Sequence, residues 1–328
     1  MKTKKQVFNK YLTYIVLVAV FALVTLGVET GTISRHMRSL LVPICINIIL
    51  TVSLNLVIGF LGELSLGHAG FMSVGAYAGC LFSIHFEEIL PTFVRFPLAM
   101  IVGGLTASVF GVIVGIPVLR LKGDYLAIVT LAFGEIIRSV IINLEFTGGA
   151  SGLKGTPQDS SFTWAFVVLL LTYFVITNLA DSKHGRAIHS LKENLIAAQS
   201  CGVDVNLYKL MAFIIAAFFA GIAGVLAGHN FSILTAGAFD YNRSIEILVM
   251  VVLGGIGNLK GSIVSAIVLT VLPESLKFLS DYRMLIYSIV LIIITILGSS
   301  QRWKDIKGSF SLSDMLKTGG KGKVKANE

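Results

Sequence analysis

Apolar residues along this chain of 328 residues are gathered into long runs separated by short polar segments. The runs cover residues 11–28, 39–61, 59–79, 96–119, 125–143, 163–180, 207–229, 245–256, 263–272 and 284–297. Most of them approach the roughly 20 residues with which a helix crosses the hydrocarbon core of a bilayer. The pattern predicts an all-α polytopic membrane protein with about eight to ten transmembrane helices, some of them broken or re-entrant.

A long hydrophilic segment, residues 181–206, lies between two membrane-length apolar runs. Four apolar residues in it recur at spacings of three and four: Ile188, Leu191, Leu195 and Ala198. The polar residues Lys192, Glu193, Asn194 and Gln199 fall on the opposite face of the same helix. The spacing predicts an amphipathic helix at the membrane surface. Such a helix either lies along the bilayer without a partner or docks a soluble protein.

Two signals suggest where this amphipathic helix begins and ends. Ser190 and Glu193 have capping-box spacing, which places the start at Ser190 after a turn around Gly185. Gly202 stands where the helix is expected to end with a residue in the left-handed region.

Residues 53–79 combine many glycines with polar side chains at membrane depth. Glycines at this density favour either a helix broken inside the membrane or close packing of small faces, and the polar residues favour the break. Glu63 and His68 are too costly to face lipid, so we expect them at a loop end, in a polar cavity or against each other. The candidate residues of a translocation path in this segment are Asn55, Glu63, Ser65, Gly67 and His68.

A second glycine-rich interruption, Gly257 to Gly261, separates the short apolar runs 245–256 and 263–272. Either flanking residues extend both runs into ordinary spans, or the runs form a broken pair like residues 53–79. Glycine-interrupted short segments in two halves of a chain are a pointer to a translocation site.

Three further features concern helix contacts and loops. Glu135 and Arg138 are three residues apart in one span, which predicts an intramembrane ion pair. The run 207–229 is rich in Ala and Gly and should lie inside the bundle. Residues 145–161 are rich in Gly, Ser and Thr and predict an irregular polar loop, a candidate contact surface.

Composition supports the membrane class and excludes others. The hydrophobic fraction is 55% and the charged fraction only 13%, against about a quarter charged in soluble proteins. The net charge of +8 arises from basic residues near loops and termini, so topology explains it and no nucleic acid partner is needed. The cysteines Cys45, Cys80 and Cys201 form no CxxC motif, so we expect neither a disulfide framework nor a metal site.

Charge also predicts domains and orientation. We expect a basic tail at 1–10, a single transmembrane domain at 11–300 that includes 181–206, and a basic tail at 301–328. No cleavage site follows Leu26, so the first run is read as an uncleaved helix. If all runs cross, Lys and Arg are divided 18 to 7 between the two sides. The richer side holds both termini and 181–206, which are therefore predicted to be cytoplasmic.

Four blocks in order carry a resemblance to a known family: SLNLVIGFLGELSLGHAGFMSVGAYAG, RLKGDYLAIVTLAFGEIIR, TGGASGL and GRAIHSLKENLIAAQSCGVDVNLYKLMAFIIAAFFAGIAGVLAG. They resemble the LivM-type permease of bacterial branched-chain amino-acid ABC transporters, from about Leu40 to Leu276. The resemblance implies a multi-pass permease in the bacterial inner (plasma) membrane. It implies as partners a second, LivH-like permease, two cytoplasmic ATPases and an extracytoplasmic substrate-binding protein.

The same resemblance makes residues 181–206 the ATPase-coupling segment, with Gly185, Arg186, Ala197, Ala198 and Gly202 as its candidate contact residues. The general importer motif has Glu-Ala-Ala followed by Gly, whereas this chain has Ile196, Ala197 and Ala198 followed by Gly202. The glutamate is missing, but the spacing of the small residues is kept.

The chain has no GxxxxGK[ST] phosphate-binding motif and no set of convergent nucleophile, base or metal ligands. We therefore expect no catalytic residue, no enzyme activity and no cofactor on this chain, with ATP and magnesium bound by the partner ATPases. Within this reading the substrate is a branched-chain amino acid or, alternatively, urea or a short amide. A stand-alone secondary transporter is the competing class, in which Glu63, His68, Glu135 and Arg138 would couple ions.

Overall fold

The computed structural model describes residues 34–121 and 123–275, together with residues 13, 18, 19, 21–28, 30, 289 and 292. The predicted tails 1–10 and 301–328 lie outside the described residues, as do much of the run 11–28 and almost all of 284–297. The chain divides into two compact units, residues 1–271 and 272–328. The fold described below is that of the first unit, and the single domain predicted for 11–300 stays a prediction.

The first half of the fold contains α2 (Arg35–Asn55), η1 (Leu56–Leu61), α3 (His68–His85), α4 (Thr92–Val118), α5 (Asp124–Asn143), η2 (Glu145–Thr147), η3 (Gly149–Ser151) and β1 (Leu153–Lys154). The second half contains α6 (Phe162–Asp181), α7 (Lys183–Glu193), α8 (Leu195–Ser200), α9 (Val205–Gly228), β2 (Ile233–Leu234), η4 (Ala236–Phe239), α10 (Tyr241–Gly254) and α11 (Leu259–Ser275). The all-α class is confirmed, since β1 and β2 are the only strands among the described residues.

Five helical segments in the described part of the chain are long and apolar enough to cross a membrane: Met37–Leu61, Thr92–Val118, Asp124–Asn143, Phe162–Asp181 and Val205–Gly228. The chain is thus a polytopic membrane protein. Helix α10 has 14 residues and α11 has 17, so each is shorter than the ~20 residues of a full span. The count of eight to ten crossings stays a prediction, because the first and last runs lie largely outside the described residues.

The core is a group of three helices, α3, α4 and α9, which all pack against one another. Gly75 of α3 meets the backbone of Gly221 of α9, and Gly221 in turn meets the backbone of Gly103 of α4. A Cβ atom at Gly75 or Gly221 would collide with that backbone, so only glycine permits this approach. Helix α9 is therefore buried in the bundle, as its small residues predict.

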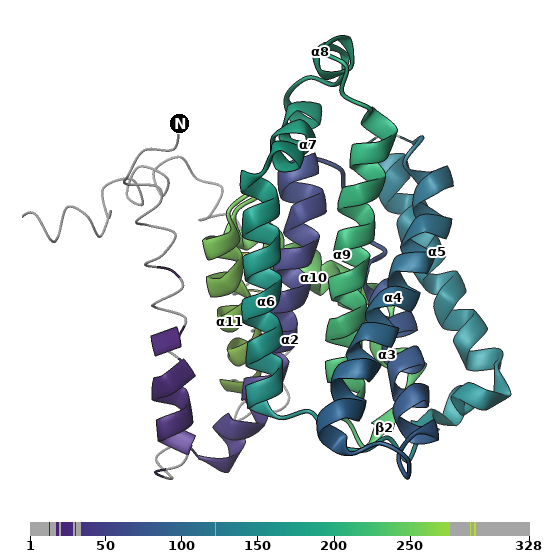
Figure 1. Ribbon diagram of the computed structural model, residues 1–328, viewed down its shortest axis with the longest axis vertical. Helices are drawn as coiled ribbons and strands as arrows, with labels where there is room; N and C mark the ends of the chain where they lie inside the picture. Colours follow the sequence, from purple (N-terminus) through teal and green to yellow (C-terminus); the bar gives the residue numbers. More distant parts are fainter. Residues whose placement is uncertain are drawn as a thin grey trace, which may run out of the picture. The chain divides into compact units, whose positions relative to one another are not determined.

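The two ends of the bundle are defined by the chain connections (Figure 1). Helix α6 leads from the β1 loop to α7, and α9 returns from α8 to β2. We call these ends the α7 end and the β1 end. Asp204 caps α9 at the α7 end by accepting hydrogen bonds from the N–H groups of Asn206 (3.0 Å) and Leu207 (3.1 Å).

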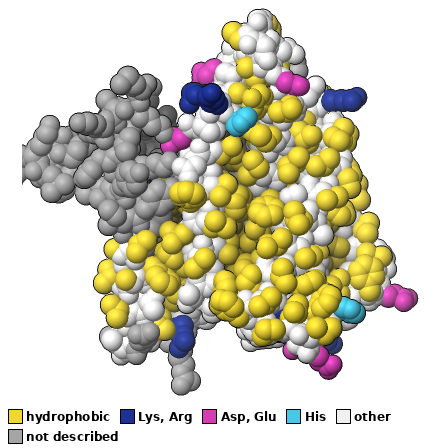
Figure 2. All heavy atoms as spheres, in the orientation of Figure 1, with side chains coloured by type: hydrophobic (Ala, Val, Ile, Leu, Met, Phe, Trp, Pro, Cys, Tyr) yellow, Lys and Arg dark blue, Asp and Glu magenta, His cyan; other side chains and the backbone are white. Residues whose placement is uncertain are grey.

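Between the two ends, the face drawn in Figure 2 is covered mainly by hydrophobic side chains, with charged groups near its margins. On α4 the exposed residues Leu98, Ile101, Leu105, Val109 and Ile113 recur every three to four positions. Such a stripe is suited to contact with lipid tails.

The loop at 145–161 is more ordered than the irregular loop that its composition predicts. It contains η2, η3 and β1, and β1 pairs antiparallel with β2, with Leu153 opposite Leu234. An ion pair of 2.7 Å between Arg95 and Asp159 also ties it to α4. Local composition could not reveal this order, because the strand partner comes about 80 residues later in the chain.

Candidate functional site

The helix that starts at Arg35 is broken at the α7 end, as the glycines and polar residues predict. Helix α2 ends at Asn55 and continues as the π-helical turn η1 to Leu61. Gly62 then adopts φ +83°, a conformation that residues with a side chain rarely accept. Non-helical backbone follows to Gly67, and α3 starts at His68.

Glu63 and His68 do not pair with each other. The Glu63 carboxylate forms an ion pair with Lys209 at the start of α9, and both side chains are almost buried. The imidazole Nε2 of His68 lies 2.8 Å from the hydroxyl of Ser53. Lys209 is 146 residues from Glu63, so no local pattern could identify it as the partner.

The α10–α11 connection is also broken, and this break contacts the first one. Gly255 and Gly257 both have positive φ, +95° and +83°. Asn55 Oδ1 accepts a hydrogen bond from the Gly257 N–H (2.9 Å), and Asn55 Nδ2 donates to Ser262 Oγ (2.6 Å). A Cβ at Gly59 would collide with Asn55 and Gly257. Of the two arrangements that the sequence left open for 245–272, the structure has the broken pair.

The amphipathic segment begins earlier than its capping box predicts, and it forms two helices. Helix α7 starts at Lys183 with Ser182 as its cap and ends at Glu193. The Ser190 hydroxyl instead donates to the carbonyl of Ala187 (2.7 Å). Asn194 caps α8 by accepting from the N–H groups of Ile196 (3.1 Å) and Ala197 (3.0 Å). The predicted start at Ser190 is wrong because Ser182 caps the helix instead, by accepting a hydrogen bond from the Gly185 N–H (3.1 Å). Gly185 therefore lies in the first turn of α7 and not in a turn before it.

The buried and exposed faces of this segment follow the predicted pattern. Ile188, Leu191 and Ala198 are buried and Leu195 is half-buried, whereas Lys192, Glu193, Asn194 and Gln199 are exposed. Gly202 has φ +82° and ends the segment as predicted.

The five candidate coupling residues differ in their surroundings. Gly185 packs against the carbonyl groups of Leu179 and Ala180 at the end of α6. Arg186 and Ala197 are exposed, Ala198 is buried and open space surrounds Gly202. The neighbouring Ile196 side chain, where the importer motif has glutamate, is 75% exposed.

Helix α7 is attached directly to the first helix break. The Lys192 ammonium group donates a hydrogen bond to the carbonyl of Gly59 in η1 (2.9 Å). The methylene groups of Lys192 also lie where a side chain at Gly62 would be. A displacement of α7 therefore acts on the backbone of the break.

The candidate path residues are mostly engaged with other protein groups. Gly67 packs against the carbonyl of Thr130, so a Cβ there would lie 2.9 Å from that oxygen. The N–H of Ala69, in the first turn of α3, donates to Ser244 Oγ (3.2 Å). Asn55, Glu63 and His68 have the partners named above. Ser65 differs, because it is 2% exposed and its hydroxyl has no hydrogen-bond partner.

Glu135 and Arg138 form the ion pair that their spacing predicts, with 2.8 Å between Arg138 Nη2 and Glu135 Oε2. Both side chains are about one-third exposed on α5 (31% and 29%). The pair neutralises both charges within one helix. In the described residues, no group of three or more His, Cys, Asp and Glu side chains is placed to hold a metal ion.

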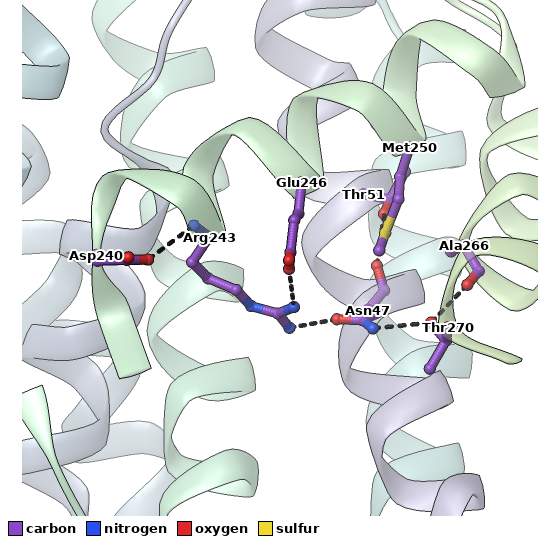
Figure 3. Close-up of polar contacts among 8 residues, drawn as sticks. All are labelled: Asn47, Thr51, Asp240, Arg243, Glu246, Met250, Ala266 and Thr270. Atoms are coloured by element: carbon purple, nitrogen blue, oxygen red, sulfur yellow. Dashed lines mark hydrogen bonds and ion pairs between the residues drawn. The ribbon is translucent and has the colours of Figure 1, made fainter. Parts of the chain in front are cut away.

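A polar cluster that no local sequence pattern indicates joins α2, α10 and α11 (Figure 3). The Arg243 guanidinium donates to Asn47 Oδ1 and pairs with Glu246 at 3.0 Å. Asn47 Nδ2 donates to the Thr270 hydroxyl (2.8 Å). Arg243 lies in the first turn of α10.

These features define a membrane permease with two discontinuous helical segments in contact. The family model for the permease component of branched-chain amino acid transport systems matches residues 36–295. The chain belongs to this family.

Individual relatives agree with the family match. The chain is 34% identical over 286 residues to the high-affinity branched-chain amino acid transport system permease protein LivM of Escherichia coli, a match that covers 76% of this chain and 66% of that protein. Against LivM of Salmonella typhimurium it is 34% identical over 299 residues, covering 80% and 69%. Against the ribose import permease protein RbsC of Haemophilus influenzae it is 25% identical, covering 88% and 92%. The matches thus span about two thirds of the length of the LivM proteins.

Proposed function

We propose that this chain is the membrane-spanning permease subunit of an ATP-driven importer of branched-chain amino acids. The observation that carries the proposal is the coupling segment, residues 181–206, which projects from the α7 end and exposes Ile196 at its tip. An exposed apolar side chain beside the small residues Ala197 and Gly202 suits a helix that docks in a groove of another protein.

The proposed partners are two ATPase subunits at the coupling segment, a second homologous permease and an extracytoplasmic substrate-binding protein. ATP and magnesium are bound by the ATPases, since this chain has no phosphate-binding motif. The names of the LivM relatives, which refer to a transport system with a permease protein, support an assembly of several subunits.

Two cationic side chains carry movement from the coupling segment into the membrane in this proposal. Lys192 connects α7 to the Gly59 carbonyl, and Lys209 connects the start of α9 to Glu63. Both contacts end on the broken connection between α2 and α3. A rigid-body movement of the docked ATPase would therefore change the backbone at the break directly.

We also propose that substrate passes beside the break, with Ser65 as the candidate lining residue of greatest interest. A buried hydroxyl without a partner is unfavourable, so it is suited to a group that hydrogen bonds transiently to cargo. The ion-coupled alternative gains no support from Glu63 or Glu135, because each carboxylate is already paired with a cation.

The proposal is tested by reconstituting the chain in proteoliposomes with a LivH-like permease, two ATPase subunits and a substrate-binding protein. Leucine uptake should require ATP, magnesium and the binding protein, because the phosphate-binding motif that this chain lacks is expected in the partner ATPases. Labelled urea should not be taken up. Leucine uptake by this chain alone under an ion gradient would contradict the proposal. ATP-driven uptake of urea but not of leucine would show that the proposed substrate is wrong.

We further propose that the α7 end faces the cytoplasm and the β1 end faces outward, with both termini cytoplasmic. Cys201 is an exposed thiol at the α7 end, whereas Cys45 and Cys80 are buried. A membrane-impermeant maleimide should therefore label the wild-type chain, expressed without the ATPase subunits, in inside-out vesicles and not in intact cells. In a Cys201→Ser background, Lys154→Cys at the exposed β1 strand should give the opposite result. Labelling of both positions from one side would exclude this topology.

A further inference from the structure

A cavity of about 270 Å³ lies beside the polar cluster of Figure 3, between α2, α3, α9, η4 and α10. Its lining includes the apolar residues Ile46, Met72 and Phe239, together with the polar residues Asn47 and Arg243. The volume is close to the lower limit of about 300 Å³ for small-molecule sites, so the cavity suits a small molecule. An apolar lining with a few polar groups at one side is the composition expected of such a site.

The charged side of this cavity lies deep in the membrane region. Asn47, which accepts from Arg243, is 12 residues after Arg35 and 14 residues before Leu61. At 1.5 Å per residue, these are about 18 and 21 Å of helix on either side. Arg243 therefore reaches α2 near the middle of its length, from the first turn of the short helix α10. An ionisable group at this depth marks a functional site more often than a structural one.

The charged groups of Arg243 and Glu246 are not fully enclosed by protein. Arg243 uses its guanidinium for Glu246 and Asn47, and a guanidinium has five N–H donors. The Arg243 side chain is 22% exposed and that of Glu246 is 48% exposed. A carboxylate this exposed at membrane depth is too costly to face lipid, so its exposed side must face water or protein. Asp240 is engaged elsewhere, since it accepts from the Arg243 N–H (3.1 Å) and from Asn242 (2.7 Å).

We propose that this cavity is a transit subsite for a zwitterionic α-amino acid with an apolar side chain. Arg243 receives the carboxylate, and Ile46, Met72 and Phe239 contact the side chain. Glu246 is outside the lining of the cavity but pairs with Arg243 at 3.0 Å, and it receives the ammonium group from that position. The adjacent opposite charges match the two charges of the cargo, and neither urea nor a sugar carries such a pair. The proposal rests on the proposed function and deepens it, since it explains which chemical group separates amino acids from neutral substrates.

If Arg243 only ties α10 to α2, cargo should not contact the cavity, whereas the proposed subsite requires that contact. The test uses photo-leucine, a diazirine analogue that keeps both charged groups, with the complete importer in proteoliposomes. After illumination, crosslinked peptides should contain Met72 or Phe239, and excess leucine should suppress the crosslink. Arg243→Gln should lower the yield about tenfold, the size of effect expected for losing a charge-assisted hydrogen bond to a carboxylate.

Arg138→Gln is the matched control, because it also removes the cation of an i,i+3 pair in a membrane helix. Its crosslink yield should stay within about twofold of the wild type, since no bond to cargo is lost. Glu246→Gln is the second variant if Arg243→Gln does not assemble, because its exposed side chain is not needed for packing. It should also lower the yield, with assembly checked by size-exclusion chromatography.

Crosslinks only at residues away from the cavity would overturn the subsite. Equal yields from the wild type, Arg138→Gln and both cluster variants would do the same. Failure of leucine uptake by the wild-type importer would instead reject the proposed function, so the two failures are distinguishable.

Discussion

Replacing Lys209 with glutamine is expected to lower the free energy of unfolding by about 3–5 kcal/mol, the cost of leaving one partner of a buried ion pair without its counter-ion. The Lys209 and Glu63 side chains are 5% and 14% exposed. Water can therefore solvate little of the Glu63 carboxylate once the ammonium group is gone. The loss should be seen as a lower midpoint of thermal unfolding in detergent and a lower abundance in the membrane.

The double variant Glu63→Gln/Lys209→Gln should recover most of the stability, because two amides can hydrogen bond at the same place without any charge. Arg138→Gln serves as the control, since its pair on α5 is about one-third exposed (31% and 29%). Its cost should be below about 1 kcal/mol. A single variant as stable as the wild type would mean that Lys209 does not neutralise Glu63.

Gly202→Leu is expected to abolish ATP-driven uptake and the co-purification of the ATPase subunits. Two effects contribute. The φ of +82° at Gly202 costs a residue with a side chain about 1–2 kcal/mol, and the added side chain occupies the surface proposed to meet the ATPase. Nothing in the described chain lies within 4 Å of a Cβ at Gly202, so the side chain starts in open space outside the permease.

Gly155 offers a matched control, because it has φ +81° and an equally open surrounding at the β1 end. Gly155→Leu therefore carries the same backbone strain without touching the coupling segment, and the ATPase should still co-purify with it. Gly202→Asn separates the two effects, since asparagine tolerates the left-handed region. Normal ATPase binding by Gly202→Leu would reject the docking surface.

The extents of the helices could be predicted from the sequence because the thickness of the bilayer sets the length of an apolar spanning helix. The run 163–180 corresponds to Phe162–Asp181, and the run 125–143 to Asp124–Asn143. The break after α2 was also predicted, since glycines and charged groups cannot continue a lipid-facing helix there.

Contacts between helices that are far apart in the chain could not be predicted from the sequence. The bond from Lys192 to Gly59 joins residues 133 apart, and that from Arg243 to Asn47 joins residues 196 apart. Helical periodicity describes the face of one element and contains no information about which element meets it. The capping-box error has a local cause, because Ser182, Ser190 and Asn194 are all good caps, and the sequence does not decide that Ser182 and Asn194 are the ones used.

The glycine contacts among α3, α4 and α9 limit how this permease can move. Where backbone touches backbone, as at Gly75 and Gly221, no side chain can change rotamer to absorb a sliding step. Separation of the helices would open an empty gap, which forfeits dispersion contacts. These three helices should therefore turn as one block during a transport cycle. The change in shape is then left to the parts outside the block, which include α10 and the two backbone breaks.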